Sequence, residues 1–88
     1  MFTVYVIYSP TYDKIYIGFT SDPKNRLLSH NELATKGHTI KYRPWVIAYT
    51  EEYQTKTEAI KRENQIKSAS GRRFIWKIIR EKFGSSDS

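Results

Sequence analysis

Two runs of apolar and β-branched residues, separated by a turn, open the chain. Residues 2–8 and residues 14–19 are rich in aromatic and β-branched side chains. Residues 9–13 between them hold Pro10 and several turn-forming residues. This composition is typical of two antiparallel strands joined by a tight turn. We therefore expect the chain to begin with a β-hairpin.

Helical spacing replaces the strand pattern after the hairpin. Asp22 can cap a helix whose first turn contains Pro23, a position that tolerates proline. We expect this helix to end within residues 34–37. Its apolar side consists of Leu27, Leu28 and Leu33.

A loop and a third strand are expected next. Residues 36–43 are polar and basic, which is typical of a loop. Pro44 then suits the beginning of a strand, because a proline is tolerated at a strand's first residue. We place this strand at residues 45–50.

Two further helices are expected in the second half of the chain. Residues 55–58 have the form of a capping box, which predicts a helix from there to about Ser68. Ser70 and Gly71 interrupt the pattern. A last helix, ending at about Phe83, is then indicated by the helical spacing of Phe74, Ile75, Ile78, Ile79 and Lys82.

The expected order is strand, strand, helix, strand, helix, helix. It predicts an α+β fold, an α/β sandwich in which helices flank a small three-stranded antiparallel sheet. With 88 residues the chain has the size of one domain, so an active site must share its elements with the hydrophobic core. We assign residues 1–83 to this domain and residues 84–88 to a flexible C-terminal tail.

The composition excludes several classes of protein. The chain has no cysteine, which rules out disulfides and thiolate metal sites and fits a reducing compartment. No apolar run approaches the length of a membrane span, and the N-terminus lacks the pattern of a signal peptide. We expect a soluble cytoplasmic protein with no membrane partner.

The net charge of +6 is concentrated in one segment. Between Lys56 and Lys82 lie nine basic and three acidic residues, whereas the rest of the chain holds six of each. A one-sided basic field on a small domain is typical of nucleic-acid binding. The same composition also describes a solvated helix face, and charge alone does not separate the two interpretations.

Four residues in the first third of the chain carry side chains suited to phosphate chemistry. Tyr5 and Tyr16 lie on the two expected strands, and Arg26 and His30 are four residues apart on the first expected helix. A phenol can pass a proton, a guanidinium can hold two phosphate oxygens, and an imidazole titrates near neutral pH. The alternatives are tyrosines that pack in the core and basic residues that face solvent.

Glu63 stands out because of the residues around it. Ile60, Glu63 and Ile66 are spaced three apart on the expected helix, in a stripe that should face the core. A buried carboxylate needs a partner, such as Arg26, Lys67 or a bound cation. The alternative is an ordinary ion pair with a neighbouring basic residue at the rim.

At these positions the chain resembles the GIY-YIG nuclease superfamily. The first signature of that family corresponds to Thr3-Val4-Tyr5 and the second to Tyr16-Ile17-Gly18. The helix arginine falls on Arg26, the histidine or tyrosine one turn later on His30, and the metal-binding glutamate on Glu63. The chain is most similar to small stand-alone bacterial members. These are related to the catalytic domains of the excision-repair incision subunit and of structure-selective junction nucleases.

Three departures from the family pattern limit what can be transferred. Thr3 replaces the glycine of the first signature, and Phe19 stands where the excision-repair branch has a lysine. The asparagine found beyond the glutamate helix in several branches has no clear counterpart in residues 68–79.

The resemblance implies a metal-dependent endonuclease that hydrolyses DNA phosphodiester bonds and is directed to a structure or a lesion in repair or recombination. It implies one Mg²⁺ or Mn²⁺ ion, with Glu63 as the protein ligand. Arg26 would bind the scissile phosphate, and His30 would relay a proton or hold the phosphate. Either Tyr5 or Tyr16 would be the general base, which requires positive neighbours because a phenol ordinarily has a pKa of about 10.

Other basic residues are expected to contact the DNA backbone. They are Lys24, Lys36, Lys41, Arg43, Lys61, Arg62, Lys67, Arg72 and Arg73. A rival interpretation is a non-catalytic nucleic-acid-binding module that retains the fold, and a third is an adaptor for an acidic protein. The sequence does not reveal whether a homodimer or a targeting protein is involved.

Overall fold

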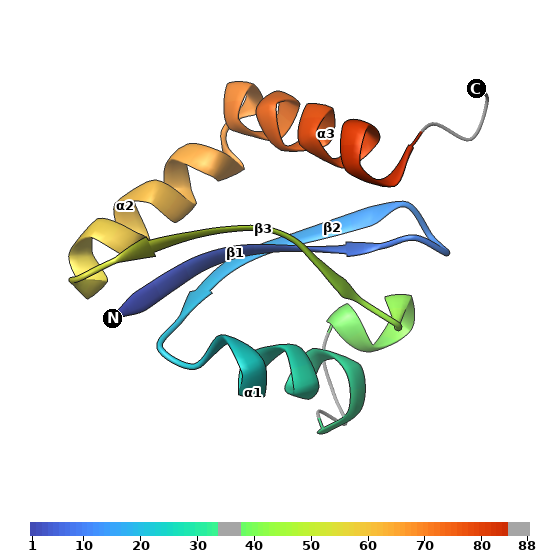
Figure 1. Ribbon diagram of the computed structural model, residues 1–88, viewed down its shortest axis with the longest axis horizontal. Helices are drawn as coiled ribbons and strands as arrows, with labels where there is room; N and C mark the ends of the chain where they lie inside the picture. Colours follow the sequence, from blue (N-terminus) through green and yellow to red (C-terminus); the bar gives the residue numbers. More distant parts are fainter. Residues whose placement is uncertain (34–37, 85–88) are drawn as a thin grey trace.

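A three-stranded antiparallel sheet forms the middle layer of the structure, a computed structural model that describes residues 1–33 and 38–84. In chain order the strands and helices are β1 (Phe2–Ser9), β2 (Lys14–Thr20), α1 (Pro23–Leu28), β3 (Val46–Tyr53), α2 (Lys56–Lys67) and α3 (Ala69–Phe83). The central strand is β1, with β2 and β3 on either side. Figure 1 shows α1 on one face of the sheet and α2 and α3 on the other. The predicted α+β sandwich and its element order are confirmed.

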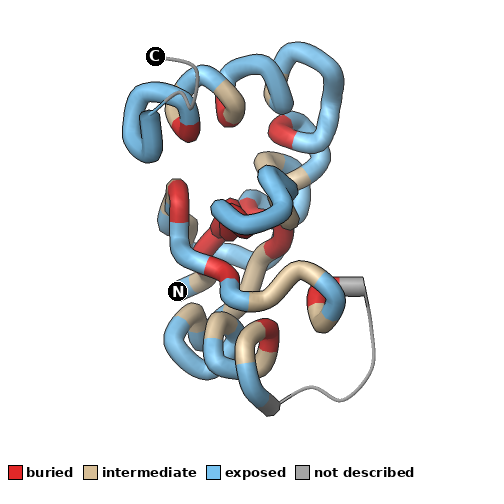
Figure 2. The backbone as a smooth tube through the Cα atoms, turned by 90° about the vertical axis from the view of Figure 1, so that its right-hand side faces the viewer, coloured by how far each residue is buried: buried red, intermediate tan, exposed pale blue. Residues whose placement is uncertain are grey.

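The central strand β1 divides the hydrophobic core into two parts, because successive side chains point to opposite faces of a sheet. One part, toward α2 and α3, contains Val4, Val6, Tyr8, Ile17, Ala48, Ala59, Ile66, Ile75 and Ile79. The other, toward α1, contains Tyr5, Ile7 and Trp45, with Tyr16, Leu27 and Tyr42 packed against them. In Figure 2 the buried positions of the sheet lie between the two helical layers. This double burial explains the continuous apolar run of residues 2–8.

The turn of the β1–β2 hairpin is anchored to the last helix. Asp13 adopts a positive φ of 56°, and its backbone N–H donates to the Ser9 carbonyl at 2.7 Å. Its carboxylate accepts a hydrogen bond from Tyr8 at 2.7 Å and two from Arg80 of α3, at 2.8 and 3.0 Å. The predicted hairpin is therefore present, and a residue of α3 fixes its turn.

The first helix differs from its predicted form. Asp22 caps it as expected, accepting a hydrogen bond from the Asn25 N–H at 3.2 Å. However, α-helical geometry ends at Leu28, and Ser29–Leu33 form a wider π-helical turn, called the π turn below. The predicted helix end, at residues 34–37, lies outside the described residues.

The segment before β3 is also more ordered than predicted. Residues His38–Tyr42, expected to be a loop, form a short 3₁₀ helix. The strand begins at Val46 and continues to Tyr53, beyond the predicted end at residue 50. Pairing with the N-terminal residues of β1 explains the extension, because Phe2 lies opposite Tyr53.

The last two helices follow the prediction with two corrections. Thr55 caps α2 through a hydrogen bond from the Glu58 N–H at 3.2 Å. Ile60 is 37 % exposed, whereas Ala59 faces the core in its place. The predicted break at residues 70–71 is wrong, because Ser68 caps α3 and both residues lie in its first turn.

Two predictions about the chain as a whole remain. Of residues 84–88, expected to form a flexible tail, Gly84 is the C-cap of α3 and residues 85–88 lie outside the described residues. In residues 1–33 and 38–84, none of the helices has the length and apolar character that a membrane span requires.

Gly71 is predicted to be essential for the crossing of α2 and α3. A Cβ at this position would lie 2.3 Å from the Gln65 carbonyl oxygen and 2.5 Å from the Ile66 Cα. Alanine is favoured in a helix by up to about 1 kcal/mol over glycine. Overpacking against rigid backbone costs about 1–3 kcal/mol and should prevail. We expect Gly71→Ala to lower the free energy of unfolding in urea.

The matched control for this measurement is Ser70→Ala, one residue earlier on the exposed side of the same turn. It should leave stability within about 0.5 kcal/mol of the parent, as surface substitutions usually do. A Gly71→Ala protein as stable as the control would contradict the packing argument.

Candidate active site

Tyr5 lies in the middle of β1, with its side chain on the face of the sheet that α1 covers. Its partner in the β1–β2 pair is Gly18. A Cβ at Gly18 would lie 2.7 Å from the Tyr5 hydroxyl oxygen and 3.2 Å from the Tyr16 ring. The glycine that ends the Tyr16-Ile17-Gly18 signature therefore makes room for the Tyr5 hydroxyl.

The Tyr5 hydroxyl is where strand and helix residues meet. His30 Nε2 lies 3.0 Å from its oxygen, and Arg26 Nε donates to the same oxygen at 3.3 Å. The Tyr16 ring centroid lies 6.3 Å from that of Tyr5 and 4.8 Å from that of His30. The structure thus brings together these four sequence-predicted residues, which we call the Tyr5 cluster.

Glu63, the remaining candidate, lies on α2 with its side chain 14 % exposed. Its carboxylate pairs with Lys67, one turn further along the helix, at 3.0 Å. Burial is the main cause that raises the pKa of Tyr5, and the negative charge of Glu63 adds to that shift. Glu63 therefore acts on the Tyr5 cluster through its charge, while the partner of its carboxylate is the ammonium of Lys67.

The family model of the GIY-YIG catalytic domain matches residues 1–78. The chain belongs to the GIY-YIG family. It is 36 % identical over 67 residues to a UPF0213 protein of Staphylococcus saprophyticus, covering 76 % of this chain and 80 % of that one. A UPF0213 protein of Staphylococcus haemolyticus is 33 % identical over 70 residues, covering 80 % of this chain and 84 % of the relative.

Membership of the GIY-YIG family has consequences for function. The family is one of nucleases, so membership implies nuclease activity with DNA as the substrate. GIY-YIG nucleases generally use a divalent metal ion. The match over residues 1–78 also confirms the resemblance that the tyrosine, arginine, histidine and glutamate positions indicated.

His30 of this GIY-YIG domain is carried by the π turn rather than by a regular α-helix. Arg43 holds that turn, since its Nε donates to the His30 carbonyl and its Nη2 to the Ser29 carbonyl at 3.2 Å. Asn31 accepts from the Trp45 backbone N–H at 2.6 Å and donates to the Trp45 carbonyl at 3.0 Å. Turns of this kind are rare and are frequently found at functional sites.

Thr39 contacts the second nitrogen of the His30 imidazole. Its Oγ1 lies 3.0 Å from Nδ1, and both residues are buried. The Thr39 carbonyl accepts a hydrogen bond from the Trp45 indole N–H at 2.8 Å, which fixes its position. We assign the Tyr5 proton to the bond with Nε2, because the phenol then has an acceptor for its proton while its oxygen accepts from Arg26. The ring proton then lies on Nδ1, donated to Thr39.

These supporting residues were not predicted as part of the site. Asn31 and Thr39 are common residue types, and neither they nor Trp45 stand at a recognisable spacing from His30. Only the folding of residues 39–45 back against the π turn brings them to the imidazole. A pattern along the chain therefore carries no signal for them.

Burial determines the charge state of the Tyr5 cluster. It is the largest cause that lowers the pKa of His30, to about 4, and the positive charges of Arg26 and Arg43 add to the effect. Burial also raises the pKa of Tyr5, although the hydrogen bond and charge of Arg26 oppose the shift. Arg26 thus favours ionisation of the phenol, as a positive neighbour should, but burial outweighs it. Near neutral pH a neutral phenol and a neutral imidazole lie beside a cation.

The basic residues predicted to contact DNA fall into two groups. Arg43, Arg62 and Lys67 have partners within the protein, namely backbone carbonyls, Glu51 and Glu63 respectively. Lys36 lies outside the described residues. Lys24, Lys41, Lys61, Arg72 and Arg73 are exposed, as is Lys67, although the Nε of Arg72 donates to the Lys67 carbonyl at 3.0 Å. That these nine basic residues contact DNA stays a prediction. The exposed ones are those whose charge is presented to solvent.

The side chains near the cluster suit a hard divalent cation. Glu63 offers carboxylate oxygens, and Mg²⁺ prefers oxygen ligands while keeping several waters. Within residues 1–33 and 38–84, no three His, Asp or Glu side chains converge on one point. A bound ion would therefore rely on Glu63 together with water and substrate phosphate, and Lys67 would have to release the carboxylate.

The buried neutral His30 should make stability depend on pH. In the unfolded chain its pKa returns to 6.5, whereas in the folded protein it is about 4. The unfolded state therefore binds the proton first, so the free energy of unfolding should fall as the pH is lowered from 6.5 to 4. Urea unfolding at a series of pH values measures this slope, and His30→Asn should reduce it.

A second ionisable group provides an internal check on that experiment. The ion pair and hydrogen bonds of Glu51 lower its pKa from 4.5 to about 2, against the opposing effect of burial. Its contribution to stability is therefore lost only between pH 4.5 and 2. An unfolding free energy that is flat from pH 6.5 to 4.5 would show that His30 is not buried in its neutral form.

Thr39→Val tests the support of the imidazole. Valine keeps the shape of threonine but leaves the buried Nδ1–H of His30 without an acceptor, which costs about 1–3 kcal/mol. We expect the variant to unfold at correspondingly lower urea concentration. Thr50→Val, at an exposed position of β3, is the matched control and should change little. Equal stability of the two variants would contradict the assigned hydrogen bond.

Proposed function

We propose that this GIY-YIG chain is a metal-dependent DNA endonuclease, directed to a structure or a lesion in cytoplasmic DNA repair or recombination. The observation that supports this most directly is the Tyr5 hydroxyl, bonded to both His30 and Arg26. It combines a proton acceptor and a phosphate-binding cation at a single oxygen atom. A surface that only binds DNA needs the cation, but it has no use for a buried neutral imidazole.

Arg26 is the proposed ligand of the scissile phosphate. Its residue is exposed, while its Nε is held by the Tyr5 oxygen. A guanidinium can bind two phosphate oxygens, and its charge offsets the negative charge that grows in the transition state. A phosphate held there would lie next to the Tyr5 hydroxyl.

Tyr5 is the proposed general base, with His30 as the acceptor of its proton. Hydrolysis requires the attacking water to lose a proton and the leaving oxygen to gain one. The Tyr5 oxygen takes the proton of the water while its own proton passes to His30 Nε2, and solvent protonates the leaving oxygen. A neutral imidazole at 3.0 Å makes this transfer possible without a pre-formed phenolate.

Tyr16 and Glu63 complete the proposed site. Tyr16 packs against the imidazole, at 4.8 Å between ring centroids, and orients water or phosphate. Glu63 would hold one Mg²⁺ or Mn²⁺ ion, which when bound supplies positive charge to the phosphate and to the attacking water. The exposed residues Lys24 and Lys41 are proposed contacts for the DNA backbone near this site.

Cleavage of branched, flapped and linear DNA in Mg²⁺ tests the proposal. Tyr5→Phe keeps the ring and removes the proton acceptor, so we expect the rate to fall by about 100-fold or more, as for loss of a general base. Glu63→Ala should abolish cleavage, so that no metal-dependent rate remains. Both variants should keep most of their DNA binding, measured by fluorescence anisotropy.

Two substitutions serve as controls. Tyr12→Phe changes a half-exposed tyrosine in the hairpin turn, and Glu58→Ala changes an exposed glutamate in the first turn of α2. Both should cleave at the parent rate. Cleavage by Glu63→Ala at the parent rate would refute the assignment of the site. DNA binding without cleavage by the parent protein would favour a non-catalytic module.

A further inference from the structure

A hollow of about 490 Å³ opens where α2 and α3 cross. Small-molecule sites in proteins range from about 300 to 1,000 Å³. The described residues that line the hollow include none of the proposed catalytic residues. They are Arg62, Gln65, Ile66, Ser68, Ser70, Gly71 and Phe74.

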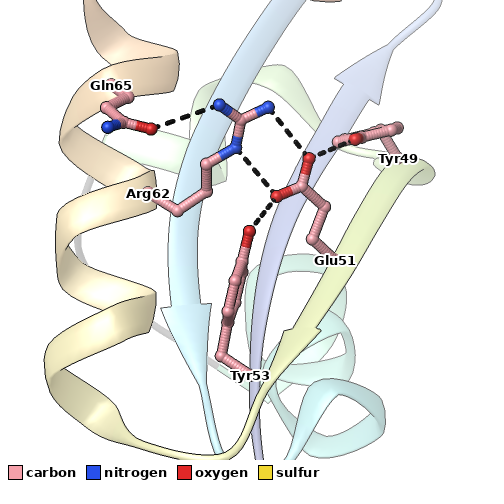
Figure 3. A network of polar contacts seen from close by, with 5 residues as sticks. All are labelled: Tyr49, Glu51, Tyr53, Arg62 and Gln65. Carbon is pink, nitrogen blue, oxygen red and sulfur yellow. Dashed lines mark hydrogen bonds and ion pairs between the residues drawn. The ribbon is translucent and has the colours of Figure 1, made fainter.

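The rim of the hollow is held by a network of hydrogen bonds (Figure 3). Arg62 donates through Nε and Nη2 to the Glu51 carboxylate, at 2.8 and 3.0 Å. Tyr49 and Tyr53 also donate to that carboxylate. The remaining Arg62 nitrogen, Nη1, donates to the Gln65 side-chain oxygen at 3.3 Å. The charge of Arg62 is thus paired within the protein, and its function at the rim is to orient Gln65.

Gln65 is oriented to present its amide nitrogen. In Figure 3 its oxygen points to Arg62, and its nitrogen lies on the opposite side. Gln65 is exposed, and its amide nitrogen can donate a hydrogen bond to an acceptor on the edge of a base. The hydroxyls of Ser68 and Ser70 are further polar groups of the lining.

Phe74 gives the hollow an aromatic wall. Its residue is 43 % exposed, an unusual position for a phenylalanine, although its ring packs against Tyr49 at right angles, 5.7 Å between centroids. Gly71, one turn earlier, also lines the hollow and lets the backbone of α2 approach α3, since a Cβ there would lie 2.3 Å from the Gln65 carbonyl oxygen. Arg72 and Arg73 are exposed next to this turn, and the described lining contains no carboxylate. An aromatic platform flanked by cations is the usual means of binding single-stranded nucleic acid.

We propose that the hollow binds an unpaired nucleobase of the DNA substrate. The base stacks on Phe74, its edge bonds to the Gln65 amide, and Arg72 and Arg73 contact the adjoining phosphates. The identification of the ligand as DNA rests on the proposed function. The subsite therefore defines a class of substrate. DNA with an unpaired nucleotide, such as a flap or an overhang, would be preferred to continuous duplex.

Binding without cleavage tests this subsite. The full chain is titrated, in EDTA, into a duplex with a single-stranded overhang containing 2-aminopurine and into a fully paired duplex of the same sequence. Stacking on Phe74 should quench the 2-aminopurine fluorescence, and the overhang should bind about tenfold more tightly than the duplex. Phe74→Ala should weaken binding of the overhang about fivefold or more and leave duplex binding unchanged.

Two further variants separate stacking from folding. Phe74→Leu keeps an apolar side chain against Tyr49 but cannot stack on a base, so it should lose the preference for the overhang while remaining folded. Phe83→Ala removes a similarly exposed phenylalanine, 39 % against 43 %, from the other end of α3 and should keep the preference. Quenching that is the same in the parent and in Phe74→Leu would overturn the proposal.

The outcome is independent of the proposed cleavage reaction. If the parent protein does not bind the overhang, or binds it no better than duplex, the subsite is refuted even where the protein cleaves DNA in Mg²⁺. If the protein binds unpaired bases through Phe74 but cleaves nothing, the endonuclease proposal fails and the subsite stands.

Discussion

The hydroxyl of Tyr5 is the point on which the candidate site depends. It lies in the gap left by Gly18 on the neighbouring strand, where a Cβ would approach the hydroxyl oxygen to 2.7 Å. From there it contacts Arg26 of α1 and His30 of the π turn, which lie on the face of the sheet toward which its side chain points. The hydroxyl can therefore make both contacts only when Gly18, the register of β1 with β2 and the position of α1 are all in place. A one-residue slip between β1 and β2 would place Tyr5 on the opposite face and separate it from both partners.

The buried position of this hydroxyl explains the electrostatics of its neighbours. A charged imidazole would be poorly solvated there and would lie close to two guanidinium groups, so His30 is neutral. The π turn that carries it leaves the Ser29 and His30 carbonyls to be bonded by Arg43, and Thr39 takes the remaining imidazole nitrogen. The protein thus stabilises an uncharged proton acceptor within a basic surface, an arrangement that suits proton transfer better than simple attraction of a phosphate.

Helix α2 presents different chemistry to its two sides. Glu63 contributes negative charge near the Tyr5 cluster, whereas Arg62, the preceding residue, is directed to Glu51 on β3. The positive charge of the C-terminal half is consequently not all available to DNA. Part of it is paired with carboxylates that hold α2 and the hairpin turn in place, as the contacts of Arg62 and Arg80 show. The exposed remainder includes Arg72 and Arg73, beside the hollow at the helix crossing.

The sequence by itself determined the order of strands and helices, because each was indicated by local periodicity, by a capping residue such as Thr55 or by a turn. It also determined the identity of the Tyr5 cluster, since the signature residues stand at recognisable positions along the chain. Only the tertiary structure decided the partners of those residues. Thr39 at the imidazole and Arg43 at the π turn could not be assigned from a pattern, and among the partners that the sequence offered for Glu63 the structure selects Lys67. Local backbone preferences act between near neighbours in sequence, whereas burial and hydrogen bonding between distant segments depend on the packed fold.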